Sequence, residues 1–339
     1  MNVFGIRFAP LSIPFHRRIE TFAVAQFCIL FVVGGIIFIS LTIYLFTTSY
    51  YWFPLLYCVW LYFDWNTPSR GGRRGNWMIH GSLWRHMSNY FPARLHKTVD
   101  LDPNHNYLLG FHPHGVMAVG AFMSFATEAN GFSLKFPGIR PTVLTLAGQF
   151  GIPFWRDYLM SAAVCSVSRE SVDYVLGECG DKGNAVIIVV GGALESLQAH
   201  PNAHTLVLRK RKGFVKKAIY HGAHLVPVYS FGETDIYDQL PNPEGSKLRK
   251  FQIMMTKIMG FAPPIFHGRG IFNYTLGIVP YRKPINTIVG KPIPIMKDTS
   301  PSSEKVDRIH QEYMDALESL FEEHKLKFGV DAAKRLTFL

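Results

Sequence analysis

The sequence has few charged residues and few cysteines. Charged side chains make up 17% of its 339 residues, against about 25% in an ordinary soluble domain. Apolar residues make up 48%, which excludes an intrinsically disordered chain. The four cysteines are scattered without a Cys-x-x-Cys pair, so a disulfide scaffold and a cysteine-rich zinc module are excluded. This composition favours a protein that works in contact with a membrane, in a reducing compartment.

Three motifs of common enzyme chemistries are also absent. The sequence has no Gly-x-Gly-x-x-Gly loop and no phosphate-binding P-loop, which argues against dinucleotide and nucleoside triphosphate chemistry. It has no Gly-x-Ser-x-Gly nucleophile elbow, which argues against a lipase-like covalent serine. A general base that lets one substrate attack another directly is consistent with these absences.

One long stretch, Thr21 to Phe63, contains no charged side chain. A bilayer crossing takes roughly 20 apolar residues, so the stretch holds two crossings, or one crossing and a re-entrant segment. Its first part, Thr21 to Phe46, is long enough to span. Its second part, Tyr50 to Phe63, is short and rich in the aromatic residues that favour the membrane interface. We expect a transmembrane helical hairpin with a short second arm; a buried hairpin in a large soluble protein is the alternative.

Arginines flank this stretch on both sides. Those before it are Arg7, Arg17 and Arg18, and those after it are Arg70, Arg73 and Arg74. Because basic residues accumulate on the cytoplasmic side of membrane segments, both flanks are expected in the cytosol. The predicted organisation is a short cytosolic N-terminus (1–20), a membrane-embedded hairpin (21–63) and a cytosolic, membrane-associated domain (64–339).

The remainder alternates short β-branched runs with helical patterns. Strands are expected at Tyr107–Phe111, Ala185–Val190, His204–Leu208, Leu225–Phe231 and Thr287–Val289. Helices are expected at Ser168–Cys179, Gly213–His221 and Ser303–Phe328. This alternation predicts an α/β domain with a mostly parallel sheet. Apolar residues at helical spacing from Val306 to Phe321 indicate that the last helix packs on the domain, with a position on the bilayer surface as the alternative.

Two histidines follow the first expected strand, in Phe111-His112-Pro113-His114-Gly115. Imidazole is the usual general base near neutral pH, so His112 and His114 are candidate catalytic residues. A structural pair at the end of a strand is the alternative. The H-x-H-x-D-H pattern of binuclear hydrolases would need Asp at position 116, where Val116 stands, and we expect neither a metal nor a cofactor.

A second β-rich run ends at Gly191 and Gly192, and Glu195 follows. Ligands bind at the carboxyl ends of parallel strands, and glycines allow the backbone to approach them closely. Glu195 is a candidate to orient an imidazole or to hold a hydroxyl. This segment is informative only if it converges with His112 and His114.

A third segment is strongly basic. Arg209, Arg211, Lys212, Lys216 and Lys217, together with Lys210, surround the start of the helix expected at 213–221. Helix N-termini and cationic side chains bind anions, so the phosphates of coenzyme A, anionic lipid head groups and nucleic acid are all considered. A solvated face is the alternative. Nucleic acid is disfavoured because no recognition helix or stacking motif accompanies the run.

Four segments together resemble the monoacylglycerol and diacylglycerol acyltransferase family, with similarity from about Phe8 to the C-terminus. They are Tyr90-Phe91-Pro92, His112-Pro113-His114-Gly115 and the stretches 211–233 and 269–292. The resemblance implies acyl transfer from fatty acyl-CoA, as co-substrate, to a lipid hydroxyl at the endoplasmic reticulum membrane. It further implies a multi-pass N-terminal anchor and a glycerolipid-acyltransferase-like α/β domain that faces the cytosol.

The resemblance also assigns the site. His112 and His114 match the essential pair of the family, Tyr90-Phe91-Pro92 match a segment important for activity, and Gly191, Gly192 and Glu195 match a Gly-Gly-x-x-Glu segment. Wider glycerolipid acyltransferases place Asp five positions after the catalytic His, where this chain has Met117 or Val119. Glu195 is therefore expected to supply the carboxylate, and backbone N–H groups near Gly115 or Gly191 to stabilise the oxyanion. The basic run is expected to hold the phosphates of coenzyme A.

The acceptor lipid is the least determined feature. The short N-terminus and overall similarity favour 2-monoacylglycerol, with diacylglycerol second and a long-chain (wax) alcohol as a further alternative. The sequence does not decide between His112 and His114 as the base. A lipid-binding membrane scaffold is the non-enzymatic alternative, and a homo-oligomer is an expectation from the family alone.

Overall fold

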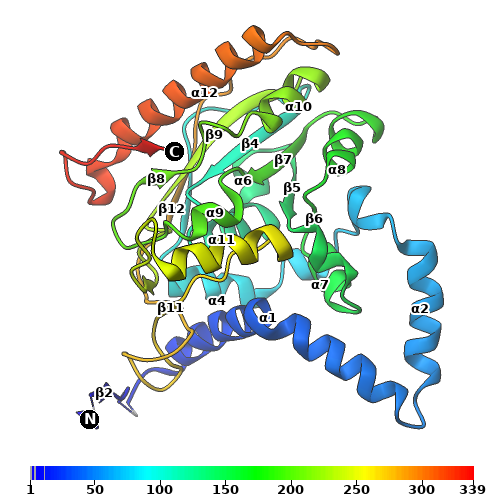
Figure 1. Ribbon diagram of the computed structural model, residues 1–339, viewed down its shortest axis with the longest axis vertical. Helices are drawn as coiled ribbons and strands as arrows, with labels where there is room; N and C mark the ends of the chain where they lie inside the picture. Colours follow the sequence, from blue (N-terminus) through cyan, green and yellow to red (C-terminus); the bar gives the residue numbers. More distant parts are fainter. Residues whose placement is uncertain (1, 4, 11) are drawn as a thin grey trace.

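A seven-stranded sheet forms the centre of the computed structural model, which describes all residues except Met1, Phe4 and Leu11 (Figure 1). The strand order is β3-β12-β9-β4-β7-β5-β6. In that order the bounds are Arg94–Lys97, Asn286–Val289, His224–Phe231, Tyr107–His112, Asn184–Val189, Arg140–Thr145 and Val164–Ser166. The five strands from β9 to β6 are parallel, whereas β12 is antiparallel to β9 and β3 is parallel to β12. The expected α/β domain with a mostly parallel sheet is confirmed.

Short strands form three small sheets outside the centre. The pairs are β1 with β2 (Asn2–Val3 and Ile6–Arg7), β8 with β13 (Thr205–Leu206 and Thr337–Phe338), and β10 with β11 (Asp238–Gln239 and Phe266–His267). The strand expected at His204–Leu208 is therefore β8, which pairs near the C-terminus and does not join the central sheet.

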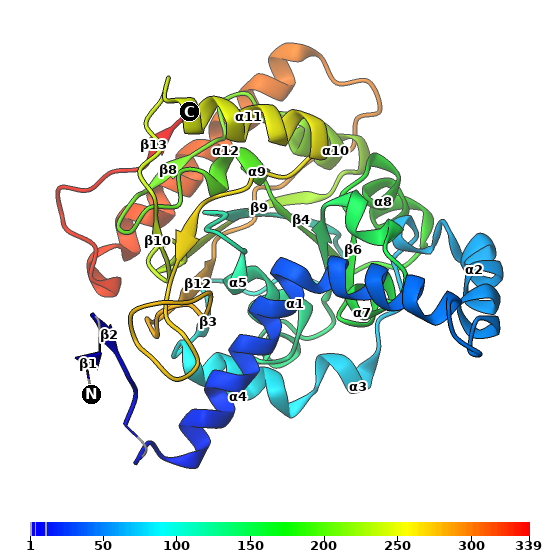
Figure 2. The ribbon, with the colours of Figure 1, turned by 60° about the horizontal axis from the view of Figure 1, so that its bottom comes forward.

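Helices cover both faces of the central sheet (Figures 1 and 2). The α-helices, α1 to α12 in order, are Phe15–Phe46, Trp52–Asp64, Asn76–Ile79, Ser82–Tyr90, Val119–Ala121, Phe132–Lys135, Trp155–Ser161, Arg169–Asp173, Gly192–Ser196, Gly213–His221, Lys247–Met259 and Ser303–His324. Leu109 and Phe111 of β4 face a core with α1 and α4, and Leu108 faces a second core with α8, α10 and α12. The last helix thus packs on the domain, as predicted.

Helix α1 begins at Phe15, before the Thr21 expected for the start of the membrane stretch, and its first half belongs to the domain core. Ala23, Val24 and Cys28 are buried there, and the Glu20 carboxylate pairs with Arg282. From Ile29 onward the helix is mostly exposed. Among the described residues, α1 is the helix that is long and apolar enough to cross a membrane. An apolar sequence predicts burial but does not distinguish lipid from a protein core, which explains the difference.

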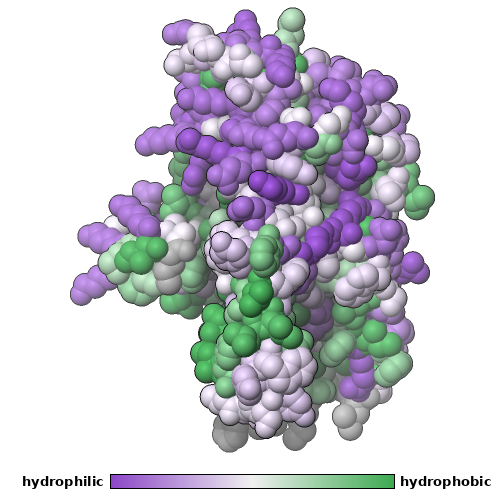
Figure 3. Space-filling model, turned by 90° about the vertical axis from the view of Figure 1, so that its right-hand side faces the viewer, coloured by the Kyte–Doolittle hydropathy of each residue, from purple (hydrophilic) through white to green (hydrophobic). Residues whose placement is uncertain are grey.

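Helix α2 is too short to span a bilayer, because its 13 residues extend over about 20 Å, whereas the hydrocarbon core is about 30 Å thick. It returns from the end of α1 toward the domain (Figure 1). Most of its large apolar side chains are exposed, among them Leu55, Leu56 and Phe63. Seen from the side of α2, hydrophobic residues gather on the lower part of the molecule and hydrophilic residues on the upper part (Figure 3).

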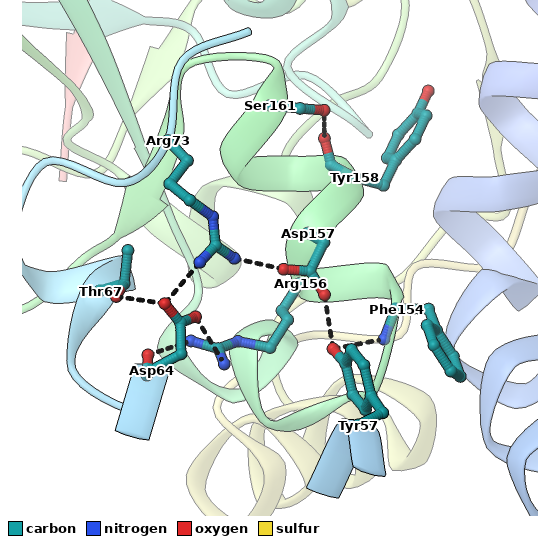
Figure 4. Close-up of polar contacts among 9 residues, drawn as sticks. All are labelled: Tyr57, Asp64, Thr67, Arg73, Phe154, Arg156, Asp157, Tyr158 and Ser161. Atoms are coloured by element: carbon teal, nitrogen blue, oxygen red, sulfur yellow. Dashed lines mark hydrogen bonds and ion pairs between the residues drawn. The ribbon is translucent and has the colours of Figure 1, made fainter. Parts of the chain in front are cut away.

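A polar cluster ties the end of α2 to α7 (Figure 4). The guanidinium of Arg156 is fully buried, lies 3.1 Å from an Asp64 carboxylate oxygen and donates to the Asp64 main-chain carbonyl at 2.8 Å. Arg73 bridges Asp64 and Asp157, and Tyr57 donates its hydroxyl hydrogen to Asp157. Helix α2 is therefore held to the domain by a buried ion pair as well as by the continuity of the chain.

Candidate active site

Three neighbouring parallel strands end at the same edge of the sheet and carry the chemistry-bearing residues. β4 lies between β7 and β9, and it ends at His112. Glu195 follows the end of β7, and Glu233 follows the end of β9. Because the carboxyl ends of parallel strands are where α/β proteins bind ligands, this edge is the candidate site. The expected convergence of the Gly191–Glu195 segment with the histidine turn is present.

His112 is fully buried at the end of β4. Its Nε2 lies 3.1 Å from the hydroxyl of Tyr313 on α12, whereas its buried Nδ1 has no hydrogen-bond partner among the described residues. Burial lowers the pKa of His112 to about 3, so the imidazole is neutral at physiological pH.

His114 is the partly exposed histidine of the turn. Its Nδ1 lies 3.1 Å from the carbonyl oxygen of Gly115. A carbonyl only accepts, so Nδ1 carries the hydrogen and the lone pair of the neutral ring is at Nε2. Burial lowers the pKa of His114 below its ordinary value, which keeps the ring in the neutral form that accepts protons.

Glu195 holds the turn through the main chain. One carboxylate oxygen accepts from the backbone N–H of His114 at 2.7 Å, and the other accepts from that of Val207 at 2.6 Å. Burial raises the pKa of Glu195 to about 7 against the opposing effect of these bonds. The carboxylate therefore meets the backbone of His114 in this structure, and its expected role toward an imidazole or a hydroxyl stays a prediction.

Gly191 makes room for this carboxylate. A Cβ built at Gly191 would lie 2.0 Å from an Oε2 atom of Glu195, so any larger residue would displace the side chain. Gly192 has a positive φ of 59° at the first position of α9. The two glycines thus form the tight turn that brings Glu195 back under the histidine turn.

Glu233 is a second buried carboxyl at the site and was not among the residues predicted from the sequence. One oxygen accepts from the backbone N–H of Gly120 at 2.9 Å, and the other has no partner among the described residues. A Cβ at Gly115 would lie 2.8 Å from the Glu233 Cγ, which places this side chain against the histidine turn. Burial raises its pKa to about 7. Glu233 lies two residues after the end of β9, and Glu195 also follows the end of a strand, β7. An acidic residue shortly after a strand was therefore the signal in the sequence.

Tyr90 and Phe91, at the end of α4, are packing residues in this structure. Both are fully buried, and the Tyr90 hydroxyl donates to the Pro280 carbonyl oxygen at 2.6 Å. Phe91 packs in the core that includes Phe111 of β4, and Pro92 is exposed. The segment therefore supports the strand that carries the histidines, and a direct contact with substrate stays a prediction.

The basic run lies beside the site, and its cations differ in their partners. Lys212 pairs with Asp307 at 2.7 Å, Lys217 pairs with Asp173 at 2.6 Å, and Arg209 donates to the Phe338 carbonyl. Arg211 and Lys216 are exposed and have no ion-pair partner among the described residues. The positive charge of Arg211 acts on Glu195, which places it near the site.

The chain matches known proteins along most of its length. The model of the family described as diacylglycerol acyltransferase matches residues 43–339. Bovine 2-acylglycerol O-acyltransferase 1 is 50% identical over 98% of this chain and 99% of its own length. Human diacylglycerol O-acyltransferase 2 is 50% identical over 93% of this chain and 81% of its own length. The crystal structure of the acyltransferase PlsC from Thermotoga maritima has a TM-score of 0.40 at 9% identity, covering 90% of this chain and 94% of that one.

Proposed function

This chain belongs to the diacylglycerol acyltransferase family and is an O-acyltransferase, and on that premise we propose that it transfers a fatty acyl group from acyl-CoA to a hydroxyl of 2-monoacylglycerol. The products are diacylglycerol and free coenzyme A, in a step of neutral-lipid synthesis. The end-to-end likeness to the bovine relative supports this acceptor. Diacylglycerol is the second candidate, because the human relative is equally identical.

The mechanism rests on the histidine turn, which carries one partly exposed and one buried histidine and whose backbone meets the side chains of Glu195 and Glu233. A general base must take up the acceptor proton, and His114 is the less buried histidine of the turn, with the lone pair of its neutral ring at Nε2. We therefore assign His114 Nε2 as the base that takes the hydroxyl proton while the oxygen attacks the thioester carbonyl. The thioester carbon then forms the ester bond and releases the sulfur of coenzyme A, which takes up a proton.

Main-chain groups around the turn complete the proposed mechanism. Glu195 binds the backbone N–H of His114 and so fixes the orientation of the turn. The next N–H group, that of Gly115, is our candidate donor to the oxyanion of the tetrahedral intermediate. Loss of one such donor typically lowers kcat by about 10²–10³.

An acceptor competition tests the proposed reaction. Microsomes that contain the protein receive labelled oleoyl-CoA with equal 2-monoacylglycerol, diacylglycerol and hexadecanol, beside a His112→Ala/His114→Ala variant. We expect labelled diacylglycerol to appear first, and only with the intact histidines. Triacylglycerol or wax ester as the first product would overturn the acceptor, and the absence of any ester would favour a lipid-binding scaffold.

The pH profile of kcat/KM tests the choice of base. The pKa of His114 lies below its ordinary value, so raising the pH through that lowered pKa produces the neutral, active ring. We expect the rate to rise with pH below about 6.5 and to be level above it. A limb centred near 7 would instead belong to a carboxyl such as Glu195, whose pKa is about 7, and it should vanish in Glu195→Gln. That outcome would contradict the imidazole as base.

The exposed cations of the basic run are proposed to bind the phosphates of coenzyme A. Because Arg211 and Lys216 are not neutralised by acids among the described residues, the double change Arg211→Ala/Lys216→Ala should raise the KM for acyl-CoA about tenfold with little change in kcat. Lys247→Ala/Lys250→Ala removes two exposed cations from α11 and is the matched control. An equal rise in KM for both pairs would indicate a general charge effect and not a phosphate site.

The membrane arrangement is proposed from the two N-terminal helices. The exposed part of α1 and the short α2 run as two arms whose outer ends both meet the domain, which supports our proposal of a hairpin that enters the endoplasmic reticulum membrane from one side, the cytosolic one. The basic flanks, with Arg17 and Arg18 before it and Arg70 after it, support this orientation. Protease protection of sites placed before Phe15 and after Asp64 tests it: both should be cut in sealed microsomes.

A further inference from the structure

Tyr313, in the middle of the C-terminal helix α12, reaches the histidine turn from the opposite end of the chain. Its side chain is fully buried. Its hydroxyl lies 3.1 Å from His112 Nε2 and 3.1 Å from the main-chain carbonyl oxygen of Gly110. Its ring packs edge-on against Phe214 of α10, with centroids 5.0 Å apart. From its spacing in the sequence, Tyr313 is predicted only as part of the apolar face of a packed helix.

The absence of a side chain at Gly110 makes room for the Tyr313 hydroxyl. A Cβ built at Gly110 would lie 2.0 Å from the Tyr313 hydroxyl oxygen. Gly110 precedes His112 by two positions on β4, so the two residues face the same side of the sheet. The missing side chain thus leaves space for one hydroxyl directly beside the imidazole, on the face that α12 covers.

The partners of this hydroxyl determine where the hydrogens lie. Two oxygens at hydrogen-bond distance need a hydrogen between them, and the Gly110 carbonyl has none, so the single hydrogen of the Tyr313 hydroxyl points to Gly110. The hydroxyl oxygen can then only accept from His112, whose Nε2 must carry the hydrogen. This assignment leaves the lone pair of the neutral ring on Nδ1, the buried atom that has no partner among the described residues.

We propose that Tyr313 is a positioning residue that holds His112 as the Nε2–H tautomer, so that Nδ1 accepts a hydrogen bond from a hydroxyl group of the acceptor lipid. The inference rests on the proposed acyl transfer and adds a role for the second histidine of the turn. A buried acceptor without a partner is unfavourable, and a bound hydroxyl would supply the missing hydrogen bond. Because burial lowers the pKa of His112 to about 3, its ring is a weak base and suits a hydrogen-bond acceptor better than a proton acceptor.

The variant Tyr313→Phe keeps the ring and removes only the hydroxyl. We expect kcat for diacylglycerol formation to fall about tenfold, with the KM for acyl-CoA unchanged, because the tautomer of His112 is no longer fixed. Tyr107→Phe is the matched control. Tyr107 lies at the start of the same strand, is equally buried and donates its hydroxyl to a main-chain carbonyl at 2.8 Å, but it is far from the turn along β4. It should leave kcat within twofold of the wild type.

A double-mutant cycle with His112→Asn separates positioning from packing. Asparagine retains an acceptor near the Nδ1 position but does not extend to Tyr313. If Tyr313 acts through His112, adding Tyr313→Phe to His112→Asn should lower kcat no further. The same tenfold loss in both backgrounds would show a role independent of His112 and overturn the inference, as would a wild-type kcat in Tyr313→Phe alone. Failure of the proposed function would look different, because the wild-type enzyme would then form no ester.

Discussion

The variant His114→Ala is expected to retain its fold and lose about 10²–10⁴-fold in kcat, the usual contribution of a general base. His114 is partly exposed, and its Nδ1 is hydrogen-bonded to the carbonyl oxygen of Gly115. Removal of the imidazole therefore leaves no buried group unpaired in the core. The loss should therefore appear in kcat with purified protein of unchanged melting temperature. Binding of acyl-CoA, measured separately, should persist.

His96→Ala is the control for this substitution. His96 lies on β3, is half-buried and is hydrogen-bonded through Nε2 to Asn286 at 2.9 Å. It should change stability slightly and kcat by less than twofold. If His114→Ala retained more than a tenth of the wild-type kcat while His112→Ala lost activity entirely, the base would be His112, and the assignment from exposure would be wrong.

The second large effect concerns stability, and we expect Asp64→Ala to lower the free energy of unfolding by about 3–5 kcal/mol. The substitution would leave the Arg156 guanidinium, which is fully buried, without its carboxylate partner, and Thr67 and Arg73 would lose the same partner. Thermal unfolding in detergent micelles measures the change. Asp181→Ala breaks a pair with Arg140 in which both side chains are about 60% exposed, and it should change stability by less than about 1 kcal/mol.

A third variant shows whether the buried charge itself is responsible. Asp64→Leu/Arg156→Met removes both charges and replaces them with apolar side chains of similar size. It should recover most of the stability lost in Asp64→Ala, because no uncompensated charge remains. A double variant as unstable as Asp64→Ala would mean that the loss arises from the backbone bond of Arg156 to Asp64 or from packing.

The sequence predicts the parts of the site that local turn residues mark at the ends of strands. Strand ends marked by turn residues locate His112, His114 and Glu195, and the parallel arrangement of their strands brings them to one edge. Tyr313 escaped prediction because its spacing is that of a packed helix, and nothing local shows that its hydroxyl meets a residue some 200 positions earlier. The carboxylate of Glu195 was predicted at the turn, but its partner atom depends on main-chain geometry.

The sequence shows where charged and apolar side chains are concentrated, but not which groups they contact in the folded protein. The basic run is present and near the site, yet Lys212 and Lys217 are neutralised by acids brought from α12 and α8 by folding. Likewise, the uncharged stretch is helical as expected, but Val24 and Cys28 lie against protein. In both cases the local pattern indicates that a side chain needs an opposite charge or an apolar environment. Which residues provide it depends on the tertiary fold.

Helix α1 shares one hydrophobic core with the central sheet, so it cannot be removed without disturbing that core. Phe27 of α1 packs on Phe122, with ring centroids 4.8 Å apart, and Phe122 belongs to the segment that follows the histidine turn. A fragment that starts after α2 would lack part of the core that packs on the central sheet and would expose the apolar surface of α4. During synthesis α1 is made before the strands of the central sheet, so the domain completes its core on a helix that is already present.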